Sequence, residues 1–397
     1  MAASEHVSGF TLDERDQRHA SVRERARERG IDCVVASGSN LRYLSNGVPG
    51  EQSGLLATEE LPMIVGIHRR WLIDIEPEVL VEAQDWISDI RRKGDDPGSV
   101  VAWISALRLE RGTVGVAMGD VSRRFYGQLQ KGLPDAKFVD ASDILADLRA
   151  IKSPQETALI EEANRIFDAG IDRVYQTAEP GMLGREVVQE GMRGMWDAGA
   201  DVESTFDVNF GPVPAQNPAL AMICLDRRVQ PGDMGTLTAH AEYRHYAGHS
   251  DQEISFGEPK RLHRDMFEAV LEVREAVLAH LKPGATQREL IEVYDRTCKE
   301  TGFRPAPHTQ IHQYGIDVPE FPGPAYQIPD PGGEADPVNL GRVGNHTIEA
   351  GMIYSVSPTL MAPEGLDSIL GGTCAVVTED GYRQLGDRTV EMLVKAG

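Results

Sequence analysis

Three ionisable side chains alternate along one short segment of the chain, at His249, Asp251 and Glu253 in the run HSDQEISF. Side chains at every second position of a β-strand lie on the same face of the sheet. An imidazole and two carboxylates on one face can accept, hold and donate protons, which is the chemistry of general acid–base catalysis. Because a buried strand face is normally apolar, this face is predicted to be either solvated or part of a pocket.

The element that must position these groups is a predicted β-hairpin. Residues 232–257, GDMGTLTAHAEYRHYAGHSDQEISFG, contain two strand-like runs on either side of a short turn. His240 and His245 flank this turn, and we expect both to be exposed. The second strand of the hairpin carries the three alternating groups.

Composition limits the class of protein and its partners. The chain has 397 residues, with 40 Lys and Arg against 62 Asp and Glu and a formal charge of -22. Its length predicts two domains, and its charge predicts a protein that binds neither nucleic acid nor anionic membranes. The N-terminal sequence lacks the pattern of a signal peptide and no apolar run is long enough to span a membrane, so we expect a cytoplasmic protein.

The first 150 residues alternate short predicted strands with helices. Strand-like runs occur at 31–38, 62–76 and 112–118, and helical patterns occur at 99–110 and 140–150. This alternation is typical of a small α/β domain. We therefore place an N-terminal domain at residues 1–150 and a second domain at residues 151–397.

The second domain contains an internal repeat. The segments PGMLGREVVQEGM, from Pro180, and PGATQRELIEVY, from Pro283, each predict a turn that leads into an amphipathic helix. A glycine-led strand follows each of them, at 232–238 and at 351–357. The repeat predicts an α+β domain with two pseudo-twofold halves, and we expect its functional site where the halves meet.

Six sequence blocks carry a resemblance to a known family. The blocks are LRAIKSPQETALIEEANRI, NFGPVPAQNPAL, QPGDMGTLTAHAEY, IHQYGIDVPEFP, IEAGMIYSVSP and CAVVTEDG. Together they resemble the creatinase, prolidase and methionine aminopeptidase family. The resemblance implies a C-terminal domain with the pita-bread fold, preceded by the smaller α/β domain.

Metallopeptidases of this family bind two metal ions through two Asp, one His and two Glu residues. By the resemblance, the Asp positions are Thr238 and His249, the His position is His312, the first Glu position is Ser357, and the second falls at or near Gly371. Hydroxyl groups and a glycine do not replace carboxylate ligands. We therefore predict no metal ligands and no cofactor; a single metal bound through His249 and His312 is the alternative.

Creatinase is a member of the family that works without a metal, and the chain is similar to it around Asp251 and His312. Gln216, however, stands where creatinase has its proton-carrying histidine. The site implied by the resemblance has three catalytic residues, His312, His249 and Asp251. Its substrate-binding residues are Gln216, Thr238, Glu253, Glu320 and Ser357.

The predicted function is a metal-independent, creatinase-like hydrolase that cleaves a C–N bond of a small polar molecule outside peptides. Asp251 is expected to bind substrate or activate water, while His312 or His249 moves the proton. The alternatives are a metal-free lyase that abstracts a proton and a catalytically dead, peptidase-like binding protein. The resemblance also implies a homodimer with its pocket near the subunit interface.

Overall fold

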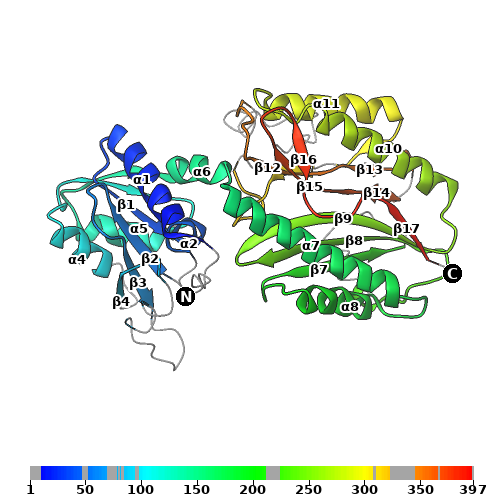
Figure 1. Cartoon of the computed structure of the whole chain (residues 1–397), viewed down its shortest axis with the longest axis horizontal. Helices are drawn as coiled ribbons and strands as arrows, with labels where there is room; N and C mark the ends of the chain where they lie inside the picture. Colours follow the sequence, from blue (N-terminus) through cyan, green and yellow to red (C-terminus); the bar gives the residue numbers. More distant parts are fainter. Residues whose placement is uncertain are drawn as a thin grey trace, which may run out of the picture. The chain divides into compact units, whose positions relative to one another are not determined.

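The structure is a computed structural model, and it describes residues 10–46, 52–68, 78, 81, 85–93, 98–211, 224–306, 310–321, 345–364 and 367–395 (Figure 1). The chain divides into two compact units, Met1–Arg149 and Ala150–Gly397. Within the described residues, no helix combines the length and the apolar character needed to cross a membrane.

The N-terminal unit is built around a six-stranded mixed sheet with the strand order β4-β3-β2-β1-β5-β6. The strands are β1 (Cys33–Ser37), β2 (Gln52–Ala57), β3 (Ile64–His68), β4 (Asp89–Lys93), β5 (Thr113–Val116) and β6 (Lys137–Asp140). The helices are α1 (Leu12–Glu28), α2 (Gly38–Ser45), α4 (Gly98–Ala106), α5 (Arg123–Gly132) and α6 (Ser142–Ala150). Helices and strands alternate from α4 to α6 as the sequence predicts, whereas β3 follows β2 without a helix between them, and β1 pairs in parallel with β5.

Four long helices define the C-terminal unit: α7 (Pro154–Thr177), α8 (Gly184–Asp197), α10 (Arg261–Leu278) and α11 (Gln287–Thr301). The capping box at the start of α7 is present, because Ser153 Oγ accepts from the main-chain N–H of Glu156 at 3.1 Å. Thr286 and Glu289 form the same arrangement at the start of α11. These caps satisfy main-chain N–H groups that a helix leaves unpaired at its first turn.

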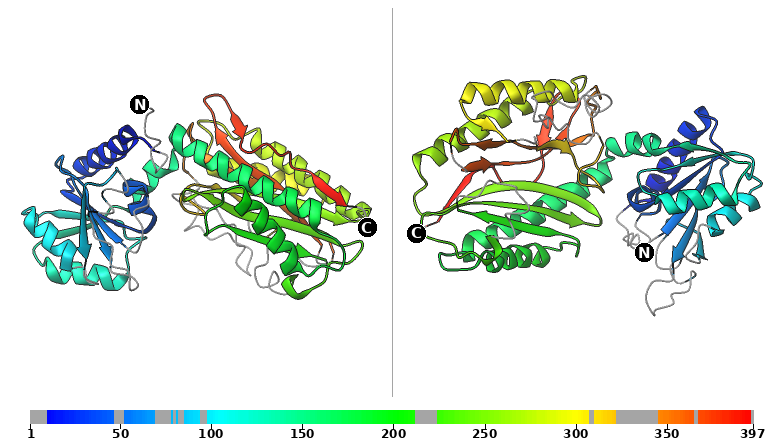
Figure 2. Two further views of the ribbon diagram at one scale, coloured as in Figure 1. Left: turned by 60° about the horizontal axis from the view of Figure 1, so that its bottom comes forward. Right: turned by 180° about the vertical axis from the view of Figure 1, so that it is seen from behind.

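An eight-stranded sheet forms the centre of this unit, and its main path is β11-β12-β15-β9-β8-β7 (Figures 1 and 2). The strands of this sheet are β7 (Thr205–Phe210), β8 (Met234–Tyr243), β9 (Tyr246–Phe256), β11 (Gln310–Gln313), β12 (Ile353–Ser357), β15 (Gly372–Val377), β16 (Tyr382–Gln384) and β17 (Met392–Lys395). A smaller sheet contains β10 (Arg304–Pro305), β13 (Thr359–Met361) and β14 (Ser368–Leu370).

The helices cover the sheet in two halves. Apolar residues of α7 and α8 pack against Phe206, Leu237 and Ile254 from β7, β8 and β9. Apolar residues of α10 and α11 pack against Tyr354, Val356 and other residues of the second half of the sheet. The predicted α+β pita-bread domain, with an α/β domain before it, is confirmed.

The predicted hairpin is confirmed as β8 and β9, and all 11 residues of β9 are buried. Its register pairs Thr238 with Asp251 and His240 with His249. Residues that are paired directly in neighbouring strands point to the same side of a sheet. The face that carries His249, Asp251 and Glu253 is therefore buried, and it lies opposite the face that packs on α7 and α8.

Candidate active site

Polar side chains continue from the hairpin across the whole width of the sheet. The strand registers align these residues in three rows on one face. The first row contains Thr205, His240, His249, Cys374, Ser355 and His312. The second row contains Asp207, Thr238, Asp251, Gly372 and Ser357. The third row contains Asn209, Thr236 and Glu253.

His249 and Asp251 form a buried ion pair in the middle of this polar face. Nε2 of His249 lies 2.8 Å from Oδ2 of Asp251, and Nδ1 lies 2.9 Å from the main-chain oxygen of Ala239. A carboxylate and a carbonyl oxygen only accept hydrogen bonds, so both ring nitrogens of His249 carry a proton. His249 is therefore an imidazolium, and Asp251 is its counter-ion.

The pKa directions agree with this assignment. Burial alone would lower the pKa of His249, but the charge of Asp251 and the hydrogen bonds to Asp251 and Ala239 raise it. Burial would raise the pKa of Asp251, but the charge of His249 and hydrogen bonds from His249, Thr238 and Ser357 lower it. The pair is thus held in its charged form.

Glu253 is in the opposite state although it lies only two residues away on the same face. Burial raises the pKa of Glu253 well above its ordinary value, and the bonds from the main-chain N–H of Leu370 and the hydroxyl of Thr236 offset only part of this effect. Glu253 is 1% exposed. The neutral acid is therefore its favoured form.

Four rings stack around the ion pair. The ring of Tyr314 lies 5.2 Å from that of His249 and 5.0 Å from that of His312, with interplanar angles of 13° and 22°. The ring of His240 lies 4.9 Å from that of His249 and 5.9 Å from that of Tyr314, and Tyr314 Oη lies 3.3 Å from Nδ1 of His240. The expected exposure of His240 is wrong: it is half-buried, and burial lowers its pKa to about 3.

This stack predicts a measurable effect of Tyr314 on His249. The π-systems of Tyr314 and of the neutral imidazole of His240 both contact the imidazolium of His249 and stabilise its charge. In Tyr314→Leu we expect the pKa of His249 to fall and the fold to lose about 1–3 kcal/mol of stability. Titration of the His249 ring followed by NMR measures the first effect. Tyr314→Phe keeps the ring and serves as the control; equal pKa values of His249 in both variants would contradict the role of the stack.

The other predicted site residues have different surroundings. Glu320 forms an ion pair with Lys152, whose Nζ lies 2.7 Å from Oε2, and both side chains are at most 4% exposed. Ser357 Oγ lies 3.3 Å from Oγ of Ser355. Gln216 lies outside the described residues. The structure thus brings His249, Asp251, Glu253, Thr238 and Ser357 onto one face, and joins His312 to them through Tyr314.

Comparisons with known proteins show the family to which the chain belongs. Residues 158–382, more than half of the chain, match metallopeptidase family M24, and residues 18–151 match the creatinase/prolidase N-terminal domain. The chain belongs to metallopeptidase family M24. The order of the two matches is the order of the two units described above.

Several M24 relatives are similar over nearly the full length. An Xaa-Pro dipeptidase of Pyrococcus horikoshii is 22% identical over 378 residues, which are 91% of this chain and 95% of that protein. The structure of an Xaa-Pro dipeptidase from Bacillus anthracis has a TM-score of 0.81 and 21% identity, and covers 96% of this chain and 100% of that one. Dipeptidase PepE from Mycobacterium ulcerans has a TM-score of 0.78 and 20% identity, covering 97% and 99%.

These comparisons correct the predicted function. The assignment to a creatinase-like hydrolase that acts on C–N bonds other than peptide bonds is wrong, because the family is one of metallopeptidases and the relatives are named Xaa-Pro dipeptidases. The same findings give no support to metal independence. The resemblance holds for the family as a whole and does not single out creatinase.

The polar face does not offer the ligands of the family's two metal ions. Thr238, Ser357 and Gly371 supply no carboxylate, and both ring nitrogens of His249 are already bonded. The strand register puts Gly372, next to Gly371, on this face. A Cβ atom at Gly372 would lie 2.1 Å from the main-chain oxygen of Val356, so no larger side chain fits there. This donor set does not fit a two-metal site.

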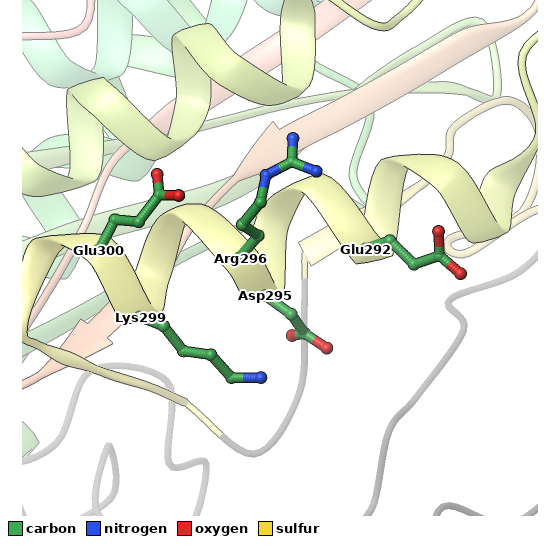
Figure 3. A pocket seen from close by; sticks show the side chains of 5 residues that line it. All are labelled: Glu292, Asp295, Arg296, Lys299 and Glu300. Carbon is green, nitrogen blue, oxygen red and sulfur yellow. The ribbon is translucent and has the colours of Figure 1, made fainter.

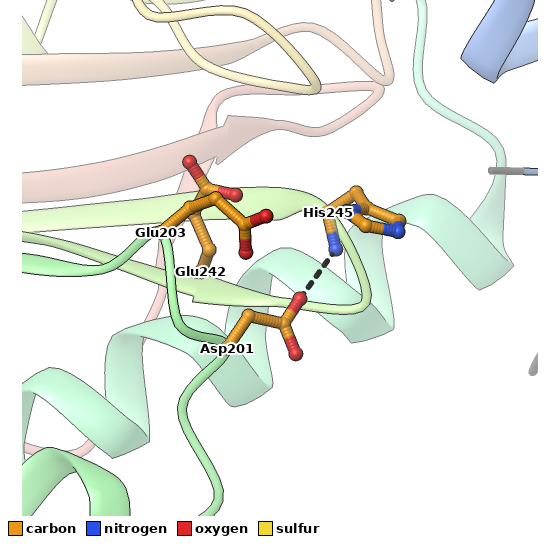
Figure 4. A group of neighbouring side chains, drawn as sticks. All are labelled: Asp201, Glu203, Glu242 and His245. Carbon is orange, nitrogen blue, oxygen red and sulfur yellow. Dashed lines mark hydrogen bonds between the residues drawn. The ribbon is translucent and has the colours of Figure 1, made fainter. Parts of the chain in front are cut away.

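One other group in the described part of the chain has the spacing of a metal site. It consists of Asp201, Glu203, Glu242 and His245, whose ligand atoms lie within 4.8 Å of one another. The group surrounds the turn of the hairpin, where Asp201 accepts a hydrogen bond from the main-chain N–H of His245 (Figure 4). Three carboxylates and one imidazole suit a single divalent cation.

We therefore predict that the purified protein binds no more than one divalent ion per chain. Mass spectrometry of metal content after loading with Mn²⁺ or Zn²⁺ and dialysis measures this number. Glu203→Gln is expected to abolish binding of this ion, whereas Glu268→Gln, on the exposed side of α10, serves as the control. Two ions per chain would show that the polar face binds metal in spite of its side chains.

A shallow depression of about 480 Å³ on the exposed side of α11 has no link to the polar face (Figure 3). Its lining residues all come from this one helix: Glu292, Asp295, Arg296, Lys299 and Glu300. Their side chains point in different directions and do not converge on a common point. The depression is the charged, solvated surface of an amphipathic helix.

Sequence reasoning missed several residues of the polar face. His240 alternates with Thr238 along β8, so strand periodicity alone could have placed it there. Asp207 and Asn209 alternate in the same way along β7, beside an apolar set of Phe206, Val208 and Phe210. Tyr314 follows His312 by two residues at the end of β11, so the same periodicity could have placed it there, although its stacking on His249 joins residues far apart in the sequence.

Proposed function

We propose that the protein is a hydrolase that cleaves the peptide bond of a dipeptide-sized substrate at the polar face of the C-terminal unit. Membership of family M24 and the near full-length similarity to Xaa-Pro dipeptidases support a peptide substrate. The observation that carries the proposal is the buried His249–Asp251 ion pair, because such a pair keeps a carboxylate charged where water is largely excluded.

We assign different roles to the three residues. His249 uses both ring nitrogens to bind Ala239 and Asp251, so it holds Asp251 in the charged form and does not itself exchange protons. Oδ1 of Asp251 is buried and accepts no hydrogen bond from the described residues. It therefore offers an acceptor that can orient an attacking water molecule.

His312 is the proton carrier in this proposal. Two ring contacts, of 5.2 Å and 5.0 Å, lead from His249 through Tyr314 to His312. Water attacks the carbonyl carbon, its proton passes to His312, and His312 delivers that proton to the nitrogen of the leaving amine as the C–N bond breaks. Thr238 and Ser357 lie in the same row of the face as Asp251 and supply hydroxyl groups to this side of the site.

The test is release of proline from dipeptides. Full-length protein is incubated with glycyl-proline and other Xaa-Pro dipeptides, with and without added Mn²⁺ or Zn²⁺, and with creatine as a comparison substrate. We expect free proline from the dipeptides and no product from creatine. Absence of peptide cleavage under every metal condition overturns the proposal, and full activity in His312→Ala removes His312 from the mechanism.

We also propose a cytoplasmic homodimer whose catalytic part is residues 151–397, with a pocket near the subunit interface. Four buried free thiols, at Cys33, Cys224, Cys298 and Cys374, support a reducing compartment. Light scattering of the purified protein measures the number of subunits. A monomer at micromolar concentration contradicts the dimer.

A further inference from the structure

The ring of His240 is held on the polar face by two neighbouring rings. His240 pairs with His249 in the register of β8 and β9, and the centroids of the two rings lie 4.9 Å apart. The ring of Tyr314 lies 5.9 Å from that of His240, and Tyr314 Oη lies 3.3 Å from its Nδ1. His240 is half-buried, so solvent reaches part of it. None of the roles assigned above uses this ring.

The hydrogen bond to Tyr314 decides which nitrogen of His240 carries a proton. Two stacked rings do not readily both carry a positive charge, and the bonds of His249 already make it the imidazolium. His240 is therefore neutral, with one N–H group and one acceptor nitrogen. A phenol is a better donor than an imidazole N–H, and an imidazole nitrogen is a better acceptor than a phenol oxygen. Tyr314 thus donates to Nδ1, and the single proton of His240 lies on Nε2.

This N–H group is available to a ligand. Nε2 of His240 has no hydrogen-bond acceptor among the described residues. His249 offers no donor, because its two N–H groups are bonded to Ala239 and Asp251. The neutral ring beside the ion pair is therefore the one that can donate where the charged ring cannot.

The spacing places this donor within reach of the reacting group. Asp251 and His240 are diagonal neighbours in the hairpin, since Asp251 lies two residues beyond the partner of His240. Diagonal side chains are roughly 7–8 Å apart, which aromatic rings can span. A water bonded to Asp251 lies roughly 2.8 Å away, and the carbonyl carbon that it attacks lies roughly 3–3.5 Å beyond it. The two spans are similar.

We propose that Nε2–H of His240 donates a hydrogen bond to the carbonyl oxygen of the bond that is cleaved, as this oxygen becomes negatively charged. The inference rests on the proposed function, in which Asp251 and His312 handle the water and its proton but no group binds this oxygen. Hydrolysis of a peptide bond places a full negative charge there, so a donor at this position has a large effect on the rate.

The electrons and the proton balance in this scheme. Water attacks the carbonyl carbon, and the π electron pair of the C=O bond moves to the oxygen. The N–H of His240 binds this oxyanion and keeps its proton. The pair then re-forms the C=O bond, and the electron pair of the C–N bond leaves with the nitrogen, which takes the proton carried by His312. The positive charge of His249, stacked on His240, further favours the oxyanion, and Tyr314 is a positioning residue.

The experiment compares two substitutions of His240 in the full-length protein. The amide nitrogen of Gln reaches about as far as Nε2, whereas that of Asn reaches about as far as Nδ1. With glycyl-proline, we expect His240→Asn to lower kcat about 10²–10³-fold with KM little changed, because this hydrogen bond forms mainly in the transition state. His240→Gln is expected to keep kcat within about tenfold of the wild type. Equal losses in the two variants, or wild-type kcat in His240→Asn, overturn the inference.

A second probe measures the same hydrogen bond without turnover. In the phosphinic analogue of glycyl-proline, a tetrahedral phosphinate replaces the peptide bond and presents a permanently charged oxygen. By calorimetry, we expect its dissociation constant to rise about tenfold to hundredfold in His240→Asn and less than about threefold in His240→Gln. Equal affinity in His240→Asn and the wild type, or no binding to the wild type at millimolar concentration, contradicts the proposed donor.

The tautomer is measured by NMR of the full-length protein with isotope-labelled histidine. We expect the proton of His240 on Nε2 in the wild type and a mixture of both tautomers in Tyr314→Phe, which keeps the ring but lacks the hydroxyl. A proton on Nδ1 in the wild type refutes the assignment. His280→Gln, exposed just after α10, is the matched control and should leave kcat and phosphinate binding unchanged. Thermal unfolding of each variant shows whether the fold is intact.

These measurements allow the two proposals to fail separately. If glycyl-proline is not cleaved but phosphinate binding depends on His240 as expected, the donor stands and the proposed hydrolysis fails. If glycyl-proline is cleaved and both substitutions of His240 leave kcat unchanged, hydrolysis stands and the donor fails.

Discussion

Asp251→Asn is expected to reduce hydrolysis by about 10²–10⁴-fold and to destabilise the fold by about 3–5 kcal/mol. The asparagine keeps the shape of the side chain but leaves the imidazolium of His249 buried without a counter-ion. His249 then favours its neutral form, and the acceptor that orients the attacking water loses its charge. Initial rates with glycyl-proline and urea unfolding followed by circular dichroism measure the two effects.

The loss of stability should depend on pH in a defined way. Asp251 has a lowered pKa, so its contribution is complete above 3.8, the ordinary value, and is lost as the pH falls through the lowered one. His249 has a raised pKa, so its contribution is complete below 6.5 and is lost as the pH rises through the raised one. The difference between wild type and Asp251→Asn should therefore be largest between pH 3.8 and 6.5.

Glu253→Gln is the matched control for this prediction. Glu253 lies two residues from Asp251 on the same buried face, but its raised pKa favours the neutral acid. An amide replaces a neutral carboxyl group with little change in charge, and its oxygen can still accept from Thr236 and Leu370. We expect a cost of about 1 kcal/mol or less in acidic and neutral buffer. A cost equal to that of Asp251→Asn would refute the assigned charge states.

The sequence predicts the fold of the C-terminal unit because local patterns and internal repeats are enough to specify its elements. The sequences Ser-Pro-Gln-Glu, at 153–156, and Thr-Gln-Arg-Glu, at 286–289, have the pattern of a capping box and mark the starts of α7 and α11. The alternation of His249, Asp251 and Glu253 places these residues on one strand face, as observed. The periodicity of side chains along a strand and the capping of a helix depend on residues close together in the chain, so both can be recognised in a single sequence.

The contacts and charges of the site depend on which distant residues meet in the fold, and these contacts cannot be recognised in a single sequence. Neither the stacking of Tyr314 on His249 nor the ion pair of Lys152 with Glu320 follows from any local pattern. The same limit explains the error in function. An absent metal ligand excludes one kind of site and does not specify a substrate, so the missing carboxylates do not establish creatinase-like chemistry.

A second large effect is expected from Lys152→Met, which should destabilise the C-terminal unit by about 3–5 kcal/mol. Nζ of Lys152 contacts Oε2 of Glu320 at 2.7 Å, Oε1 of Gln313 at 2.9 Å and the main-chain oxygen of Ala150 at 3.2 Å. Removal of the ammonium group leaves the carboxylate of Glu320 buried without this partner. Urea unfolding of the full-length protein measures the loss.

The double variant Lys152→Met/Glu320→Gln separates the ion pair from packing. It contains no unpaired buried carboxylate, so most of the stability lost in Lys152→Met should return. The segment from Gly315 to Glu320, which follows β11, has little room to rearrange after these substitutions. The carboxylate of Glu320 packs so closely on Gly315 that a Cβ atom at Gly315 would lie 1.9 Å from Oε2 of Glu320. Since β11 carries His312 and leads directly into Tyr314 and this loop, Lys152→Met should also lower the hydrolysis rate, and the double variant should restore it. A double variant as unstable as Lys152→Met would show that the methylene packing of the lysine, and not its charge, holds β11 in place.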